Sequence, residues 1–267
     1  MSIPLADPLP RPTLVTEISP IPTSSDARLG HALVPVLQHL PECFEDLEPR
    51  AASVAMRRCL APKIVLPRGP WQAPTDGARC RNWLGLLIVD GLLTRKVEVN
   101  GLCAQELLGP GDLLRPWDDE GSTHALATQT TWRVRDRASV ALLDERFAAA
   151  AAPWPSIGCC LLRTAVQRSY ANSVLLAVAR SRRAEHRLML LFWHLAERWG
   201  RVTAHGVHIP LRLTHAVLAE LVCLRRPTVS MALGGLQAAG HIARSEDGSW
   251  TLLTPRVGGG ERQELAA

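Results

Sequence analysis

The segment RRPTVSM at residues 225–231 concentrates side chains that can hydrogen-bond to a polar or anionic partner. Arg225 and Arg226 carry guanidinium groups, which bind phosphate or pair with two acceptors at once. The residues after them alternate between apolar and hydroxyl side chains: Pro227, Thr228, Val229, Ser230 and Met231. This chemistry is useful only if a rigid element presents the groups together on an exposed face.

The surrounding segment, Leu213–Leu253, predicts such an element. Thr214 stands where a helix N-cap is expected, because its hydroxyl can accept a bond from a free N–H of the first turn. Leu213 and Leu218 flank that cap as a hydrophobic staple. A short first helix follows, and Cys223-Leu224 breaks it.

A second helix is expected to begin near Arg226, with Pro227 in its first turn. Its predicted buried stripe recurs at helical spacing: Val229, Ala232, Leu233 and Leu236. Gly240 ends the helix, and Asp247-Gly248 predicts a hairpin turn. Together these signals indicate a winged helix-turn-helix, whose second helix enters the DNA major groove. The alternative is a generic pair of core helices with a surface hairpin.

The run LTHAVLAELVCLRRPTVSMALGGLQAAGHI resembles the DNA-binding domain of the Crp/Fnr superfamily of bacterial transcription regulators. The resemblance implies that Arg226 reads a guanine and that Pro227 and Met231 occupy two further base-reading positions. Cys223 replaces the usual turn glycine, so a positive φ there costs about 1 kcal/mol. The predicted DNA-binding residues are Thr214, Arg225, Arg226, Pro227, Thr228, Ser230 and Met231. Thr214, Arg225 and Thr228 are assigned to phosphate contacts.

Upstream, the pattern changes to short apolar runs typical of an antiparallel barrel or jelly roll. Strands are expected at 63–66, 83–89, 92–99, 102–108 and 125–134. Their turns are predicted at Asp90-Gly91, Asn100-Gly101 and Gly109–Asp112. The run IVDGLLTRKVEVNGLCAQELLGPGDLL resembles the double-stranded β-helix sensor domain of the same superfamily.

This sensor departs from the members that bind cyclic nucleotides. Where those members have a Gly-Glu pair, the chain has Arg115-Pro116, and where they have Arg-Ser it has Ser122-Thr123. A cyclic phosphate would lack its cationic partner, although Arg115 is a conceivable substitute. We therefore predict no cyclic nucleotide control. No cofactor or metal is predicted either, since the cysteines are scattered and the expected strands hold almost no histidine.

Helices are expected at Ala138–Ala152 and Ile157–Arg180. The second has heptad-like spacing, and the resemblance implies that it forms a homodimer interface, with a buried intramolecular helix as the alternative. The predicted fold class is α+β, with an antiparallel jelly-roll sensor, a long dimerisation helix and a winged helix-turn-helix. The expected divisions are a disordered tail, sensor, dimerisation helix, DNA-binding domain and second tail: 1–30, 31–152, 153–182, 183–255 and 256–267.

The composition fits this interpretation. The 267 residues carry a net charge of +5, a mild indication of polyanion binding. No transmembrane run or signal peptide is predicted, which favours the cytoplasm and no membrane partner. Seven cysteines without a C-x-x-C pair argue against a disulfide framework, and adjacent Cys159-Cys160 is expected to be simply buried on a helix.

The sequence thus predicts a transcriptional regulator rather than an enzyme. Its expected partners are double-stranded DNA, a second copy of the chain and, as a further candidate, RNA polymerase. A homodimer on a pseudo-palindromic operator is the favoured arrangement. One alternative is a regulator gated by a small molecule or by redox state through the barrel. An enzyme on a cupin-like barrel is disfavoured, because a cupin metal site needs clustered histidine and glutamate.

Overall fold

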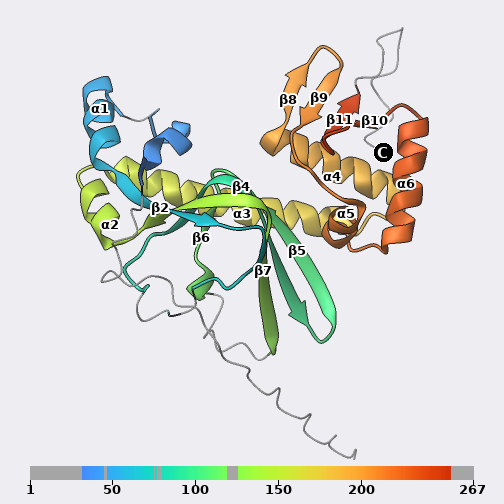
Figure 1. The fold of residues 1–267 in the computed structure, drawn as a ribbon, viewed down its shortest axis with the longest axis horizontal. Coiled ribbons are helices and arrows are strands. Elements are labelled where there is room, and N and C mark those ends of the chain that lie inside the picture. Colours follow the sequence, from blue (N-terminus) through green and yellow to red (C-terminus); the bar gives the residue numbers. More distant parts are fainter. Residues whose placement is uncertain (1–31, 45–46, 75, 77–79, 119–125, 254–267) are drawn as a thin grey trace, which may run out of the picture. The chain divides into compact units, whose positions relative to one another are not determined.

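The computed structural model describes residues 32–44, 47–74, 76, 80–118 and 126–253 (Figure 1). Both predicted disordered tails and the Ser122-Thr123 pair lie outside these residues. The chain divides into two units, Met1–His31 and Ala32–Ala267, and the description below concerns the second. Among the described residues, no helix is both long and apolar enough to cross a membrane.

Two long strands organise the N-terminal half of the described chain. β4 (Gly85–Val99) and β7 (Thr128–Leu143) pair antiparallel along nearly their whole length. The described sheet has the order β1-β2-β7-β4-β5, with β3 added to β7 and β6 to β4. The shorter strands are β1 (Leu33–Pro35), β2 (Leu60–Leu66), β3 (Gly69–Trp71), β5 (Leu102–Leu108) and β6 (Leu113–Leu114). Their apolar side chains pack inside the resulting β-roll.

The predicted hairpin at Asp90-Gly91 is wrong. β4 continues through these residues, with shifts of register against β7 between Ile88 and Leu93. Gly91 has φ +89°, and a Cβ at this position would lie 2.4 Å from the Cα of Ala138. The glycine is therefore required for close approach of two strands, a role that local sequence does not distinguish from a turn.

The predicted helix at Ala138–Ala152 is correct only in its second half. Residues 138–143 belong to β7, where they pair with β2 on one side and β4 on the other. Helix α2 (Glu145–Ala151) starts after Asp144, whose carboxylate accepts bonds from the backbone N–H groups of Arg146 and Phe147 at 3.1 and 3.0 Å. Pairing with two neighbouring strands overrides the helical propensity of the alanines.

Further short helices accompany the β-roll in this half. They are η1 (Val36–His39), η2 (Pro41–Phe44), α1 (Pro49–Arg58) and η3 (Pro116–Asp118). The long helix α3 (Pro155–Ala179) agrees with the predicted helix to within two residues at its start. Its N-terminal residues Ile157 and Leu161 pack in a core with Phe147 of α2.

A disulfide joins Cys43 of η2 to Cys160 of α3, although the cysteine pattern argues against a disulfide framework. The two Cα atoms lie 5.6 Å apart although 117 residues separate them in sequence. Only the packing of η2 against α3 brings them together. Cys160 is buried as expected, but Cys159 is exposed, so the prediction of two buried neighbours is wrong for Cys159.

An ion pair fixes α3 to the β-roll. Arg168 of α3 donates to Glu106 of β5 through Nε and Nη2, at 2.6 and 2.8 Å, and to the carbonyl of Leu113 at 3.1 Å. Asn172 adds a bond to the same carboxylate at 3.1 Å. Glu106 is buried, so this network supplies the partners that a desolvated carboxylate needs.

The C-terminal half contains α4 (Ala184–Trp199), α5 (His215–Leu221) and α6 (Arg226–Ala238). A four-stranded sheet of order β10-β11-β9-β8 accompanies the helices. Its strands are β8 (Arg201–Thr203), β9 (Gly206–Ile209), β10 (Ile242–Arg244) and β11 (Trp250–Leu253). Trp250 is fully buried, packs against Phe192 of α4, and donates through its indole N–H to the carbonyl of Leu213 at 3.1 Å.

Candidate nucleic-acid interface

Helix α5 begins as the sequence predicts. The Thr214 hydroxyl accepts a bond from the backbone N–H of Val217 at 3.3 Å, which is an N-cap interaction. Leu213 and Leu218 are both buried in the same core, as a staple requires. These local contacts fix the first residue of α5 and therefore the position of the turn that follows this helix.

The turn between α5 and α6 contains a residue in the left-handed region, at the position where the related sequences usually have glycine. Cys223 has φ +52°. The N–H of Leu224 donates to the carbonyl of Ala219 at 2.9 Å. Arg187 of α4 supports the turn, because its Nη1 donates to the carbonyl of Val222 at 2.8 Å while its Nε donates to Ser181 at 3.0 Å. One guanidinium thus binds both the turn before α6 and the connection between α3 and α4.

Replacing Cys223 by glycine is expected to preserve or raise the free energy of unfolding, and replacing it by valine to lower that free energy by about 1 kcal/mol. Glycine relieves the left-handed strain, although its extra freedom in the unfolded chain offsets about 0.4–1 kcal/mol of the gain. A β-branched residue is unfavourable at positive φ. Urea denaturation of both variants measures the difference, and equal stabilities would show that Cys223 is not strained.

Helix α6 presents the segment singled out by the sequence. Arg225 occupies the N-cap position and Pro227 lies in the first turn, where its missing N–H is tolerated. The predicted stripe is buried against the core: Val229, Ala232, Leu233 and Leu236. The opposite face, including Arg226 and Met231, is exposed.

The structure places the seven predicted site residues around the N-terminal end of α6 and the adjoining cap of α5. Five are exposed: Thr214, Arg225, Arg226, Pro227 and Met231. Thr228 and Ser230 are half-buried. The Ser230 hydroxyl lies 2.9 Å from Nδ1 of His215 in α5. Ser230 therefore also connects the two helices of the motif.

His215 is a residue that the sequence analysis missed. Burial lowers the pKa of its imidazole, and the charges of Arg244 and Arg226 lower it further. The ring is therefore neutral at pH 7, since the unperturbed value is about 6.5. A neutral ring can accept from or donate to Ser230 according to its tautomer. Nothing in the local sequence marks this pair, because fifteen residues separate the partners.

The predicted wing is present. Asp247-Gly248 makes the turn between β10 and β11, with Gly248 at φ +86° and the N–H of Ser249 donating to Asp247 at 2.9 Å. Arg244 lies over the buried Trp250 ring, 5.4 Å from its centroid. Arg212 and Arg244 are exposed beside this turn and were not among the predicted site residues. Arg244 could be identified from its basic charge three residues before the Asp-Gly turn, whereas only the fold brings Arg212 beside that turn.

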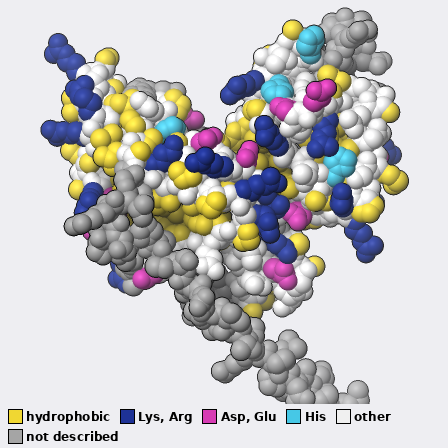
Figure 2. Space-filling view, in the orientation of Figure 1, with side chains coloured by type: hydrophobic (Ala, Val, Ile, Leu, Met, Phe, Trp, Pro, Cys, Tyr) yellow, Lys and Arg dark blue, Asp and Glu magenta, His cyan; other side chains and the backbone are white. Residues whose placement is uncertain are grey.

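Basic side chains dominate the charged residues around the motif. Figure 2 shows dark blue Lys and Arg side chains over the region of α4 to α6, with fewer Asp and Glu side chains among them. The segment 163–201 alone contains eight arginines and two glutamates. A surface of this sign attracts a polyanion independently of its sequence.

Comparison with known proteins identifies the C-terminal part. Residues 186–256 match the Crp-like helix-turn-helix domain family. The chain is also 43% identical over 75 residues to the regulatory protein CysR of Synechococcus elongatus. That match covers 27% of this chain and 36% of CysR, so the chain aligns with about a third of the length of this relative.

Solved structures resemble a larger part of the chain. One is a cyclic nucleotide-binding domain containing protein from Listeria monocytogenes, with a TM-score of 0.59, 15% identity and coverage of 81% of this chain and 97% of that chain. Another is a CRP-family transcriptional regulator from Thermus thermophilus, with a TM-score of 0.51, 20% identity and coverage of 72% and 92%. At these identities the likeness concerns the fold. It confirms the predicted fold class of a β-roll domain followed by a helix-turn-helix.

Proposed function

From the premise that this chain is a Crp/Fnr-type protein with a Crp-like helix-turn-helix domain at residues 186–256, we propose that it is a sequence-specific transcriptional regulator. It binds a pseudo-palindromic operator as a homodimer, without control by cyclic nucleotides. Its place of action is the cytoplasm, with RNA polymerase as a further partner. We propose no catalytic activity.

The observation that carries this proposal is the exposed N-terminal end of α6. Its buried stripe fixes the helix on the core, which leaves Arg226, Pro227 and Met231 facing outward. In a helix-turn-helix these are the positions that meet base edges in the major groove. A guanidinium there pairs with guanine O6 and N7, whereas Pro227 and Met231 offer apolar contact, for instance with thymine methyl groups.

The proposed dimer is supported by an apolar stripe on α3. Leu162, Val166, Tyr170 and Leu176 recur at helical spacing and are each between 60% and 72% exposed. Such a stripe on a helix that already packs on the β-roll through another face is suited to pairing with its copy. Two α6 helices related by a two-fold axis would then enter major grooves about 34 Å apart.

The test is selection of DNA from a random library by the purified, ligand-free chain, followed by sequencing. We expect two inverted half-sites, each with a guanine, and a dimer by sedimentation. Recovery of unselected DNA by a correctly folded dimer would contradict constitutive, sequence-specific binding.

A matched pair of variants separates dimerisation from general effects of a new charge. Leu162→Glu changes the α3 stripe, whereas Leu102→Glu changes a leucine on β5 that is somewhat more exposed. We expect only the first variant to sediment as a monomer and to lose the palindrome. A dimeric Leu162→Glu variant would place the interface elsewhere.

A second candidate is a regulator gated by a small molecule. A cavity of about 220 Å³ between the β-roll and α3 favours it, because Arg95, Arg115, Arg168 and Trp132 line this space. Arg115 forms an ion pair with Asp118, and Arg168 binds Glu106, so much of the positive charge is compensated. Weak operator binding by the ligand-free chain that a metabolite strengthens would favour this candidate. Full affinity without ligand would favour the first.

A further inference from the structure

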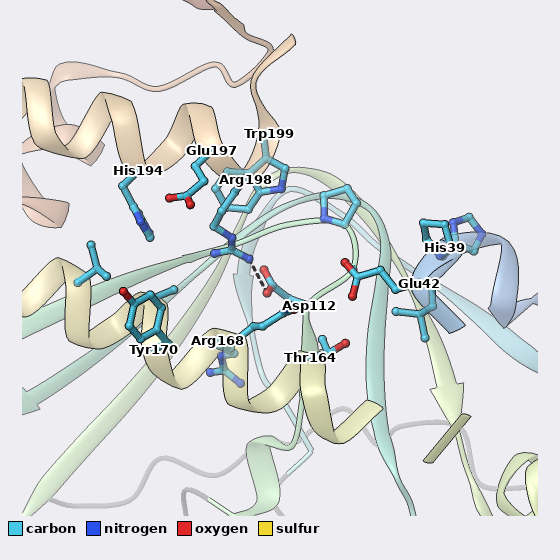
Figure 3. A pocket seen from close by; sticks show the side chains of 17 residues that line it. His39, Glu42, Asp112, Thr164, Arg168, Tyr170, His194, Glu197, Arg198 and Trp199 are labelled. Atoms are coloured by element: carbon cyan, nitrogen blue, oxygen red, sulfur yellow. Dashed lines mark hydrogen bonds and ion pairs between the residues drawn. The ribbon is translucent and has the colours of Figure 1, made fainter. Parts of the chain in front are cut away.

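A larger cavity lies away from α6 and shares the side chain of Arg168 with the cavity beside Arg115. It has a volume of about 540 Å³ and lies where α3 and α4 meet η1, η2 and the turn after β5 (Figure 3). Its lining includes both acidic and basic side chains together with apolar ones. A ligand can bind there only through hydrogen-bonding groups that have no partner within the protein.

The cationic groups of this cavity are already engaged. Arg198 of α4 donates to Asp112 at 2.6 Å, and the other carboxylate oxygen of Asp112 accepts from the N–H of Gly109 at 2.8 Å. Arg198 also lies over the ring of Trp199, 4.2 Å from its centroid. Arg168 binds the buried carboxylate of Glu106 with two of its nitrogens. An anionic ligand would therefore have to displace an internal carboxylate.

The acceptors, in contrast, are available. His194 of α4 is only 9% exposed, and within the described part of the chain its ring has no hydrogen-bond partner. Figure 3 shows this ring directed into the space between α4 and α3. Burial lowers the pKa of His194, and the charge of Arg198 lowers it further, so the ring is neutral near pH 7 and offers an acceptor nitrogen.

Two carboxylates at the rim complete the set. Glu197 of α4 and Glu42 of η2 line the cavity from different elements, and neither belongs to an ion pair among the described residues. Between these acceptors the wall is apolar or aromatic. It consists of Leu40, Pro41, Pro110, Tyr170, Ala171 and Val174.

We propose that this cavity binds a linear aliphatic polyamine. The ammonium groups would donate to Glu42, Glu197 and His194, while the methylene segments pack along the apolar wall. A charged donor paired with a carboxylate forms a stronger hydrogen bond than a neutral pair does, which favours an amine over an alcohol of equal length.

The site would also connect the two halves of the chain. Glu42 and Asp112 belong to the N-terminal half, whereas His194, Glu197 and Arg198 belong to α4, which packs against α6. A polyamine that contacts both sides favours the arrangement in which they are close, because a ligand shifts an equilibrium by its differential affinity. This regulatory consequence rests on the proposed function, whereas the binding itself does not.

The test is isothermal titration of the full chain with spermidine in the absence of DNA, since spermidine also binds DNA phosphates. We expect saturable binding of spermidine and no binding of 1,8-octanediol, an uncharged chain of similar length. Glu42→Gln and Glu197→Gln should each weaken binding by about tenfold or more, the loss expected for one charge-assisted hydrogen bond. Thermal unfolding verifies that these exposed substitutions leave the fold intact.

Glu185→Gln is the matched control, because Glu185 is an exposed glutamate of α4 that does not line the cavity. It should bind spermidine like the parent chain. Absence of binding, equal binding of the diol, or equal weakening by Glu185→Gln would each overturn the proposal. A chain that selects a palindrome but does not bind spermidine would refute this site alone and leave the proposed function standing.

Discussion

Replacing Arg226 by alanine is expected to remove base preference at one position in each half-site, with a loss of discrimination of about 1–3 kcal/mol. Arg226 is the first residue of α6 and is exposed, and within the described residues no carboxylate pairs with it. Its guanidinium is therefore available for two parallel hydrogen bonds to guanine. The measurement is fluorescence anisotropy with the selected operator and with operators altered at that base pair.

Arg225→Ala is the control for this experiment, because Arg225 precedes the helix and is assigned to a phosphate. It should weaken binding to all sequences alike and reduce the salt slope by about 1. If Arg226→Ala instead weakens operator and scrambled DNA equally, Arg226 is a phosphate ligand and base reading lies elsewhere on α6.

Replacing Arg168 by methionine is expected to lower the free energy of unfolding by about 3–5 kcal/mol. Arg168 supplies two of the hydrogen bonds to the buried Glu106 carboxylate, and only Asn172 and a longer 3.5 Å contact from Arg95 would remain. The cost comes from leaving a desolvated charge without its main partner. Urea denaturation at pH 7 measures it.

The double variant Arg168→Met/Glu106→Gln tests that explanation. It should recover much of the lost stability, because a neutral amide is less costly to bury than an unpaired carboxylate. A double variant as unstable as Arg168→Met alone would show that the aliphatic packing of Arg168, not its charge, holds α3 on the β-roll.

The same pair has a defined pH dependence. Burial acts to raise the pKa of Glu106, but the hydrogen bonds and charge of Arg168, with the charge of Arg95, outweigh burial and lower it. Its contribution to stability is therefore present above the unfolded-state pKa of about 4.3 and is lost as the pH falls through the lower folded value. In Arg168→Met we expect burial to outweigh the remaining contacts of Arg95 and Asn172 and to raise the pKa of Glu106. Lowering the pH from neutral should therefore increase the free energy of unfolding of this variant relative to its own value at pH 7.

The sequence predicted the helix-turn-helix well because its signals are local. The Thr214 cap, the left-handed Cys223 and the Asp247-Gly248 turn each depend on residues within a few positions of one another. The errors occurred where distant contacts decide the structure. The local sequence predicts a turn at Gly91, since Ala138, the neighbour that requires a glycine there, lies 47 positions away in sequence. The Cys43–Cys160 disulfide depends likewise on tertiary packing.

The same distinction applies to the candidate sites. The exposed end of α6 follows from the 3.6-residue period of its buried stripe, so its residues could be named in advance. The contact of Ser230 with His215 needs two helices to cross, and the cavity around His194 needs five segments to converge. Neither arrangement has a pattern in the sequence.

The guanidinium of Arg187 has a geometric consequence. By binding the carbonyls of both Ser181 and Val222, it ties the end of α3 to the turn from which α6 starts. In the proposed dimer paired through α3, these two hydrogen bonds would set the distance of each α6 helix from the two-fold axis. The side chain of Arg187 would then determine the number of base pairs between the half-sites. A variant that lacks this side chain should prefer operators with a shortened or lengthened spacer.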